Sequence, residues 1–155
     1  MTQYEALEEL AAKEGIFLDY TLIKSSDSID GLYLDFYTKG PKVILINRHI
    51  SQCCQLAALA EELGHHFASH GNIVALKDVT QRKQEAYGRA WAYQRLLPPT
   101  EVFSACIDGE GAIWDMADRF GLPESFVREA LIFYERKFGG AEMAPIRIHA
   151  CRTSA

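Results

Sequence analysis

The stretch between Arg48 and Lys77 contains no lysine or arginine, although it carries two adjacent glutamates and four histidines. It begins with the almost wholly apolar run 53–60 and continues as Glu-Glu-Leu-Gly-His at residues 61–65. On a helix, apolar side chains would cover nearly the whole circumference, which is typical of a buried helix. A buried, ionised carboxylate is costly unless it is protonated or paired with a cation. The segment therefore predicts a buried helix whose carboxylates need a partner, and a divalent metal ion is one such partner.

The spacing of the polar residues fits a metal site on one helix face. Glu61 and His65 are four residues apart, which places Cβ atoms on one helix face about 5–6 Å apart. The two histidines of H-E-x-x-H bind zinc with this spacing, and Glu62 stands where the general base of that motif belongs. Zinc accepts carboxylate oxygen as well as imidazole nitrogen. The pair Glu62 and His66 has the same spacing and stays open, as does an ordinary amphipathic helix with a hydrogen-bonded His65.

A family resemblance enters at these residues. Residues 59–66 read Leu-Ala-Glu-Glu-Leu-Gly-His-His and resemble the L-A-H/E-E-L-G-H signature of ImmA/IrrE family metallopeptidases. Residues 82–98 resemble that family's second helix, in which a glutamate supplies the third metal ligand, and Glu85 falls on it. Two later segments of this chain, 116–121 and 126–139, are similar to the C-terminal helices of phage and mobile-element members. The resemblance covers roughly residues 1–139, with glutamate replacing the first histidine of the motif.

The resemblance implies a metalloendopeptidase that holds Zn²⁺. The implied metal ligands are Glu61, His65 and Glu85, and the implied general base is Glu62. Two further histidines, His66 and His70, are candidates for a supporting role beside the site. The alternative is that both are ordinary surface histidines. For Glu85, the alternative is a surface ion pair with Arg89, four residues further along a helix.

The resemblance also implies a partner. Mobile-element members of the family cleave, or are thought to cleave, a repressor and so derepress phage or transposable-element genes. The implied substrate is therefore a helix-turn-helix repressor, and the implied role is that of an anti-repressor. Because Glu61 replaces a histidine, the alternative is a catalytically inactive regulator that binds a repressor without cleaving it.

Periodicity along the chain predicts an α+β fold, which the resemblance identifies as a zincin-like core. Apolar residues at helical spacing indicate a helix from Thr2 to Glu14, and three strand-like runs follow, at residues 16–23, 31–37 and 42–47. A Lys-Gly-Pro turn before the last run indicates an antiparallel hairpin. We therefore expect a small three-stranded, mainly antiparallel sheet, followed by the helix of the metal motif and the helix of Glu85.

The C-terminal part is predicted to be helical. Pro98 and Pro99 end the Glu85 helix, and helical patterns follow at residues 100–108, 112–120 and 123–138. We expect a zincin-like domain, a helical subdomain and a tail, over residues 1–99, 100–139 and 140–155. The last two helices match the spacing of a helix-turn-helix, so a DNA-binding module is a rival function. Residues 124–129, however, are poor in side chains that read bases, which favours packing or the binding of a protein substrate.

Charge and composition narrow the possible partners. The formal net charge is −5, and basic residues form no stripe, so we do not expect direct nucleic-acid binding that rests on phosphate neutralisation. The chain has no apolar run of 18 residues and no basic, apolar N-terminal leader, so we expect no membrane span and a cytoplasmic location. The four cysteines form no Cys-x-x-Cys motif and are expected to be reduced.

Overall fold

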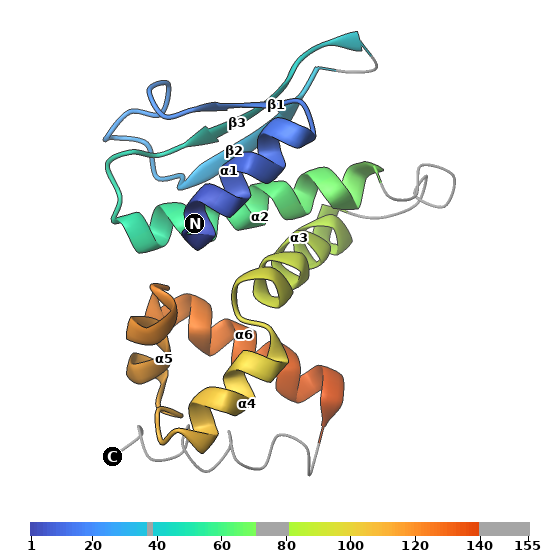
Figure 1. Ribbon diagram of the computed structural model, residues 1–155. Coiled ribbons are helices and arrows are strands. Elements are labelled where there is room, and N and C mark those ends of the chain that lie inside the picture. Colours follow the sequence, from blue (N-terminus) through green and yellow to red (C-terminus); the bar gives the residue numbers. More distant parts are fainter. Residues whose placement is uncertain (37–38, 71–80, 140–155) are drawn as a thin grey trace. The chain divides into compact units, whose positions relative to one another are not determined.

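The computed structural model describes residues 1–36, 39–70 and 81–139 (Figure 1). The predicted tail and the end of the second predicted strand, at Tyr37, lie outside these residues. Within them the chain forms six helices and three strands: α1 (Gln3–Lys13), β1 (Ile16–Asp19), β2 (Gly31–Asp35), β3 (Lys42–Ile46), α2 (Gln52–His70), α3 (Gln81–Leu96), α4 (Pro99–Ile107), α5 (Ile113–Phe120) and α6 (Glu124–Phe138). The α+β fold class is thereby confirmed. None of the helices in the described ranges has the length and apolarity needed to cross a membrane.

The chain divides into two compact units, Met1–Ala92 and Tyr93–Ala155, and their boundary falls inside α3. The first unit begins with a helix whose start is fixed by a capping box. The hydroxyl of Thr2 accepts a hydrogen bond from the backbone N–H of Glu5, and the N–H of Thr2 donates to the Glu5 carboxylate at 2.6 Å. Gly15, with a φ of 69°, then turns the chain from α1 into β1.

The sheet has the strand order β1-β3-β2. β2 and β3 form the predicted antiparallel hairpin, in which Tyr33 lies opposite Ile44. β1 pairs with β3 in parallel, so the sheet is mixed, and the expectation of a mainly antiparallel sheet was wrong in this respect. The physical reason lies in β3, whose Val-Ile-Leu-Ile run is the most apolar of the three strands and therefore occupies the centre of the sheet.

Helices α1 and α2 lie on the same face of the sheet in the first unit (Figure 1). Strand residues that point towards them are fully or almost fully buried: Ile16, Ile44 and Ile46. Leu59 and Leu63 of α2 are also completely buried in this layer. Phe17, one residue after an inward-facing position, is 68% exposed on the opposite face of the sheet. The alternation fixes the register of the sheet, and that register determines which β2 residues reach α2.

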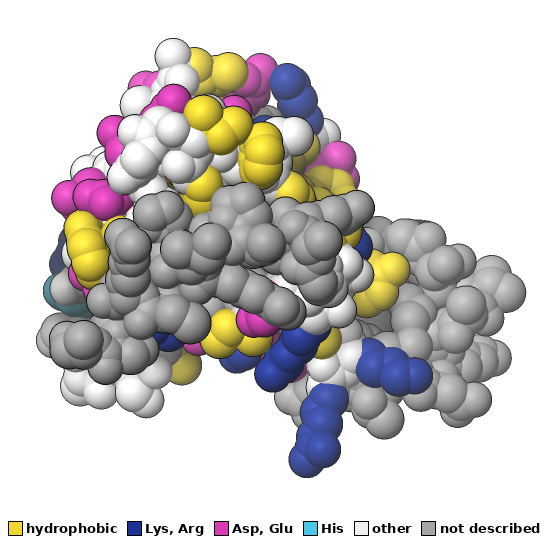
Figure 2. Space-filling view, turned by 90° about the horizontal axis from the view of Figure 1, so that it is seen from below, with side chains coloured by type: hydrophobic (Ala, Val, Ile, Leu, Met, Phe, Trp, Pro, Cys, Tyr) yellow, Lys and Arg dark blue, Asp and Glu magenta, His cyan; other side chains and the backbone are white. Residues whose placement is uncertain are grey.

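In the second unit, α5 and α6 form the predicted helical pair. Gly121 ends α5 with a φ of 63°, a left-handed conformation that favours glycine, and Ala117 and Val127 are buried. Tyr134 of α6 is completely buried, and its hydroxyl donates a 2.8 Å hydrogen bond to the carbonyl of Leu97. On the face of the molecule shown in Figure 2, hydrophobic side chains are interspersed with both acidic and basic ones.

Candidate functional site

Helix α2 carries the motif residues, and its apolar side chains fix which way the polar ones point. Leu59, Ala60 and Leu63 are completely buried, so the helix cannot rotate about its axis without exposing them. The side chains of Glu61, Glu62 and His65 are only partly exposed. The sequence prediction of a buried helix that carries carboxylates therefore agrees with the structure.

Glu62 lies against the edge of the sheet at β2. Its Cγ and Oε1 would be 3.0 and 3.3 Å from a Cβ at position 31, so the glycine there leaves room for the side chain. Its carboxylate accepts a hydrogen bond from the backbone N–H of Tyr33. Burial, together with the smaller effect of the neighbouring carboxylates of Glu61 and Glu85, raises the pKa of Glu62 to about 7 despite that hydrogen bond. Glu62 is therefore a carboxyl group that changes its protonation state close to neutral pH.

His65 and Glu85 face each other from two helices. Nε2 of His65 lies 3.7 Å from Oε2 of Glu85, with side chains 20% and 51% exposed. This distance is too long for a good hydrogen bond. Two ligands of one tetrahedral zinc ion, each about 2.0–2.1 Å from the metal, lie about 3.3–3.4 Å apart. The two atoms are thus close to the separation that a shared ion requires.

The predicted ligand set is only partly assembled. Glu61 is near enough to raise the pKa of Glu62, as is Glu85, so three carboxylates and one imidazole share this region. Within the described ranges, however, no three such side chains converge closely enough to hold an ion. In chemical terms the donor set suits zinc, because it offers imidazole nitrogen and carboxylate oxygen, and the crowded negative charge would be relieved by a cation. The role of Glu61 as a ligand stays a prediction.

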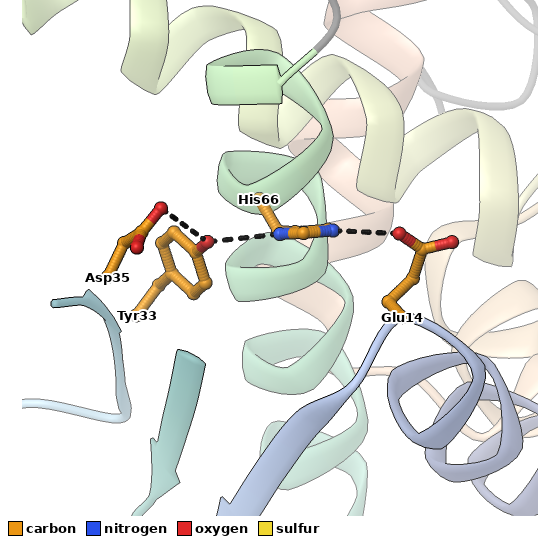
Figure 3. Close-up of polar contacts among 4 residues, drawn as sticks. All are labelled: Glu14, Tyr33, Asp35 and His66. Carbon is orange, nitrogen blue, oxygen red and sulfur yellow. Dashed lines mark hydrogen bonds and ion pairs between the residues drawn. The ribbon is translucent and has the colours of Figure 1, made fainter. Parts of the chain in front are cut away.

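His66 belongs to a different network. Its ring is 1% exposed and lies in a row between Tyr33 and Glu14, with Asp35 beyond the tyrosine (Figure 3). Nδ1 lies 3.0 Å from the Tyr33 hydroxyl, and Nε2 lies 3.0 Å from Oε2 of Glu14. Because a carboxylate only accepts, Nε2 carries a proton and donates it to Glu14. The Tyr33 hydroxyl donates to Asp35, and whether it also donates to Nδ1 or accepts from it depends on the protonation of the ring. The hydroxyl is closer to His66 than to Asp35, which is 3.5 Å away.

This network bears on two alternatives left open by the sequence. His66 is buried, so it is not an ordinary surface histidine. Both of its nitrogens are engaged by Tyr33 and Glu14, so the shifted register of Glu62 with His66 is not available in this geometry. Tyr33 therefore touches α2 twice, with its N–H at Glu62 and its hydroxyl at His66. His70 ends α2, and its side chain lies outside the part of the chain that is described.

Sequence reasoning missed several residues that shape this region. Tyr33 and Glu14 lie far from the motif in sequence, and no pattern marked them as partners of His66. Gly88, in the middle of α3, was also missed, although a glycine inside a helix carries a cost of about 1 kcal/mol and therefore calls for a packing reason. A Cβ at this position would lie 2.9 Å from Nδ1 of His65.

Comparison with known proteins adds a family. Residues 18–131, well over half of the 155-residue chain, match the Peptidase M78 family, described as the IrrE N-terminal-like domain. The match spans α2 and α3, and it confirms the resemblance that the motif indicated. The comparisons with curated proteins and with solved structures gave no match.

Proposed function

Because the chain belongs to the IrrE N-terminal-like family of peptidase-like proteins, we propose that it is a zinc-dependent endopeptidase that cleaves a helix-turn-helix repressor. The observation that carries the enzymatic part is the opposition of His65 on α2 and Glu85 on α3 beside Glu62. These residues come from two helices that the family match spans, and they combine a nitrogen donor, an oxygen donor and a carboxyl group suited to proton transfer.

Three residues would hold the ion: Glu61, His65 and Glu85. Bound zinc would supply a Lewis acid for the scissile carbonyl and make an attacking water more acidic. Two carboxylate ligands place more negative charge around zinc than two histidines do, so its acidity is expected to be lower. A slow and selective protease follows from this ligand set.

Glu62 is the proposed general base. Its carboxylate accepts the proton of the attacking water and later donates it to the leaving amine. The N–H of Tyr33 binds this carboxylate, and the missing side chain of Gly31 makes room for it, so both residues hold the base in one orientation. Burial of Glu62 keeps bulk water from competing for the proton.

The substrate part of the proposal rests on family analogy, which is an associational argument. Repressor cleavage would make the chain an anti-repressor of a phage or another mobile element, acting in the cytoplasm. A second function, that of an inactive regulator, is favoured by two observations. No three ligand side chains converge in the described parts of the chain, and Glu61 replaces the first histidine of the motif. In that case the peptidase scaffold would bind the repressor without cleaving it.

The first experiment measures bound metal in purified protein by elemental analysis. We expect about one zinc per chain, which should be lost in Glu61→Ala and Glu85→Ala. Glu101→Ala is the matched control, because Glu101 is an exposed glutamate on α4. Wild-type protein that stays empty after incubation with zinc would refute the metallopeptidase mechanism.

A second experiment separates the two functions. The probe is a purified helix-turn-helix repressor from a phage or another mobile element, mixed with zinc-loaded protein and followed by gel electrophoresis. Cleavage by the wild type and its loss in Glu62→Gln, with zinc retained, is the expected result for an enzyme. Binding of the intact repressor by both proteins, without cleavage, would support the inactive regulator.

A further inference from the structure

Helices α2 and α3 are in close contact at two glycines, Gly64 and Gly88. A Cβ added to Gly64 on α2 would overlap the carbonyl oxygen of Gly88 on α3 and lie 2.8 Å from its Cα. Real Cβ atoms essentially never lie under 3.0 Å from such a neighbour. The two backbones are therefore in contact at this crossing, with no side chain between them. Each glycine carries a cost of about 1 kcal/mol relative to alanine in a helix.

The imidazole of His65 lies on the same glycine of α3. A Cβ at Gly88 would be 2.9 Å from both Nδ1 and Cε1 of the ring, and 3.2 Å from Cγ. This edge of the ring is thus seated against the α3 backbone. Nε2, on the other edge, lies 3.7 Å from the carboxylate of Glu85, one helical turn before Gly88. One helix therefore supplies both the seat of the imidazole and the carboxylate that the imidazole faces.

We propose that Gly88 is a positioning residue, whose missing side chain seats the His65 ring so that Nε2 faces Glu85. Gly64 acts with it by setting the distance between α2 and α3. This inference rests on the proposed function, because it concerns the same metal site. It extends the site from the residues that would touch the ion to the helix crossing that orients them.

The two glycines should respond differently to replacement by alanine. At Gly88 the new methyl group meets a side chain, the ring of His65, which can rotate away. Gly88→Ala should therefore fold, and the higher helix propensity of alanine offsets part of any strain. At Gly64 the new methyl group meets backbone atoms of α3, so the helices themselves must separate. Gly64→Ala should lose both stability and metal affinity.

The test compares zinc affinity and stability in three variants. Zinc dissociation constants come from competition with a chromophoric chelator, and stability comes from urea unfolding with chelator present. We expect Gly88→Ala to bind zinc about 10–100-fold more weakly, the size of effect seen when support of a ligand is lost. Its urea midpoint should match or exceed that of the wild type. Ala86→Gly is the control, since it changes the helix propensity of α3 at an exposed position and should leave zinc affinity unchanged.

A readout on the ring itself distinguishes this inference from the proposed function. Two-bond ¹H–¹⁵N correlations report the tautomer and surroundings of each imidazole in protein treated with chelator. Gly88→Ala should move the His65 ring signals and leave those of His66 in place, because His66 is held by Tyr33 and Glu14. If the wild type does not bind zinc, the metallopeptidase proposal is refuted. Shifted His65 ring signals in Gly88→Ala would still support the inference that Gly88 positions the His65 ring. Unmoved signals, or unchanged zinc affinity in Gly88→Ala, would overturn the inference.

Discussion

Replacing Glu62 with glutamine should stabilise the metal-free protein at neutral and alkaline pH. The side chain is mostly buried against β2, and two other carboxylates lie close to it, so its charged form is disfavoured in the folded state. Glutamine has nearly the same shape, and its amide oxygen can accept the hydrogen bond from the N–H of Tyr33. The substitution therefore removes the charge and keeps the packing.

The magnitude and sign follow from the pKa of Glu62. This pKa is about 7 in the folded protein against a reference value of 4.5, a difference that corresponds to about 3 kcal/mol. The folded state holds the proton more tightly than the unfolded chain does. The contribution of the Glu62 side chain to the stability of the wild type is therefore complete below pH 4.5, and it is lost as the pH rises from 4.5 to about 7. We expect Glu62→Gln to exceed the wild type in stability by about 2–3 kcal/mol at pH 8, and by little at pH 4.5.

The assay is urea unfolding at several pH values between 4.5 and 8, with chelator present. Fluorescence of Trp91 is a suitable signal, because its ring stacks on Phe67 of α2 at a centroid distance of 5.2 Å. A Trp114→Phe background removes the other tryptophan. Glu101→Gln, at an exposed position, should show no pH-dependent gain. A difference between Glu62→Gln and wild type that does not grow with pH would refute the argument.

Two further predictions concern tyrosine hydroxyls that take part in hydrogen bonds. Tyr33→Phe removes the hydroxyl that lies 3.0 Å from Nδ1 of the buried His66, and should destabilise the first unit by about 1–2 kcal/mol in urea unfolding followed by Trp91. Tyr87→Phe, at a residue that is 71% exposed, is its control, and equal stability of the two variants would contradict the network. Tyr134→Phe removes a 2.8 Å hydrogen bond to a backbone carbonyl and should destabilise the second unit by about 1–2 kcal/mol, measured through Trp114; a loss below about 0.3 kcal/mol would show that the bond contributes little.

The sequence was most informative where a property is local. The helix α1 and the hairpin of β2 and β3 follow from periodicity and turn residues, and the structure agrees with both. The helical pair α5–α6 was likewise predicted from small residues and a turn glycine. The motif also located Glu62 and His65, because a single helix determines their spacing.

What the sequence left undetermined depends on contacts between distant segments. The parallel pairing of β1 with β3 is not marked by any residue of β1, because it results from the competition of three strands for the central position. His66 could not be distinguished from a ligand or a surface residue until Tyr33 and Glu14 were located beside it. The importance of Gly88 appears only when two helices are seen to cross there.

The bond between Glu14 and His66 has a consequence for the order of folding. It joins residues 52 positions apart, whereas β2 and β3 are joined by a short connection. Closing a long loop costs more entropy than closing a short one, so the hairpin is expected to form first and this bond late. Helix α2 then reaches its final position against α1 after the folding transition state. A ligand that recognises that position should slow unfolding while leaving the folding rate nearly unchanged.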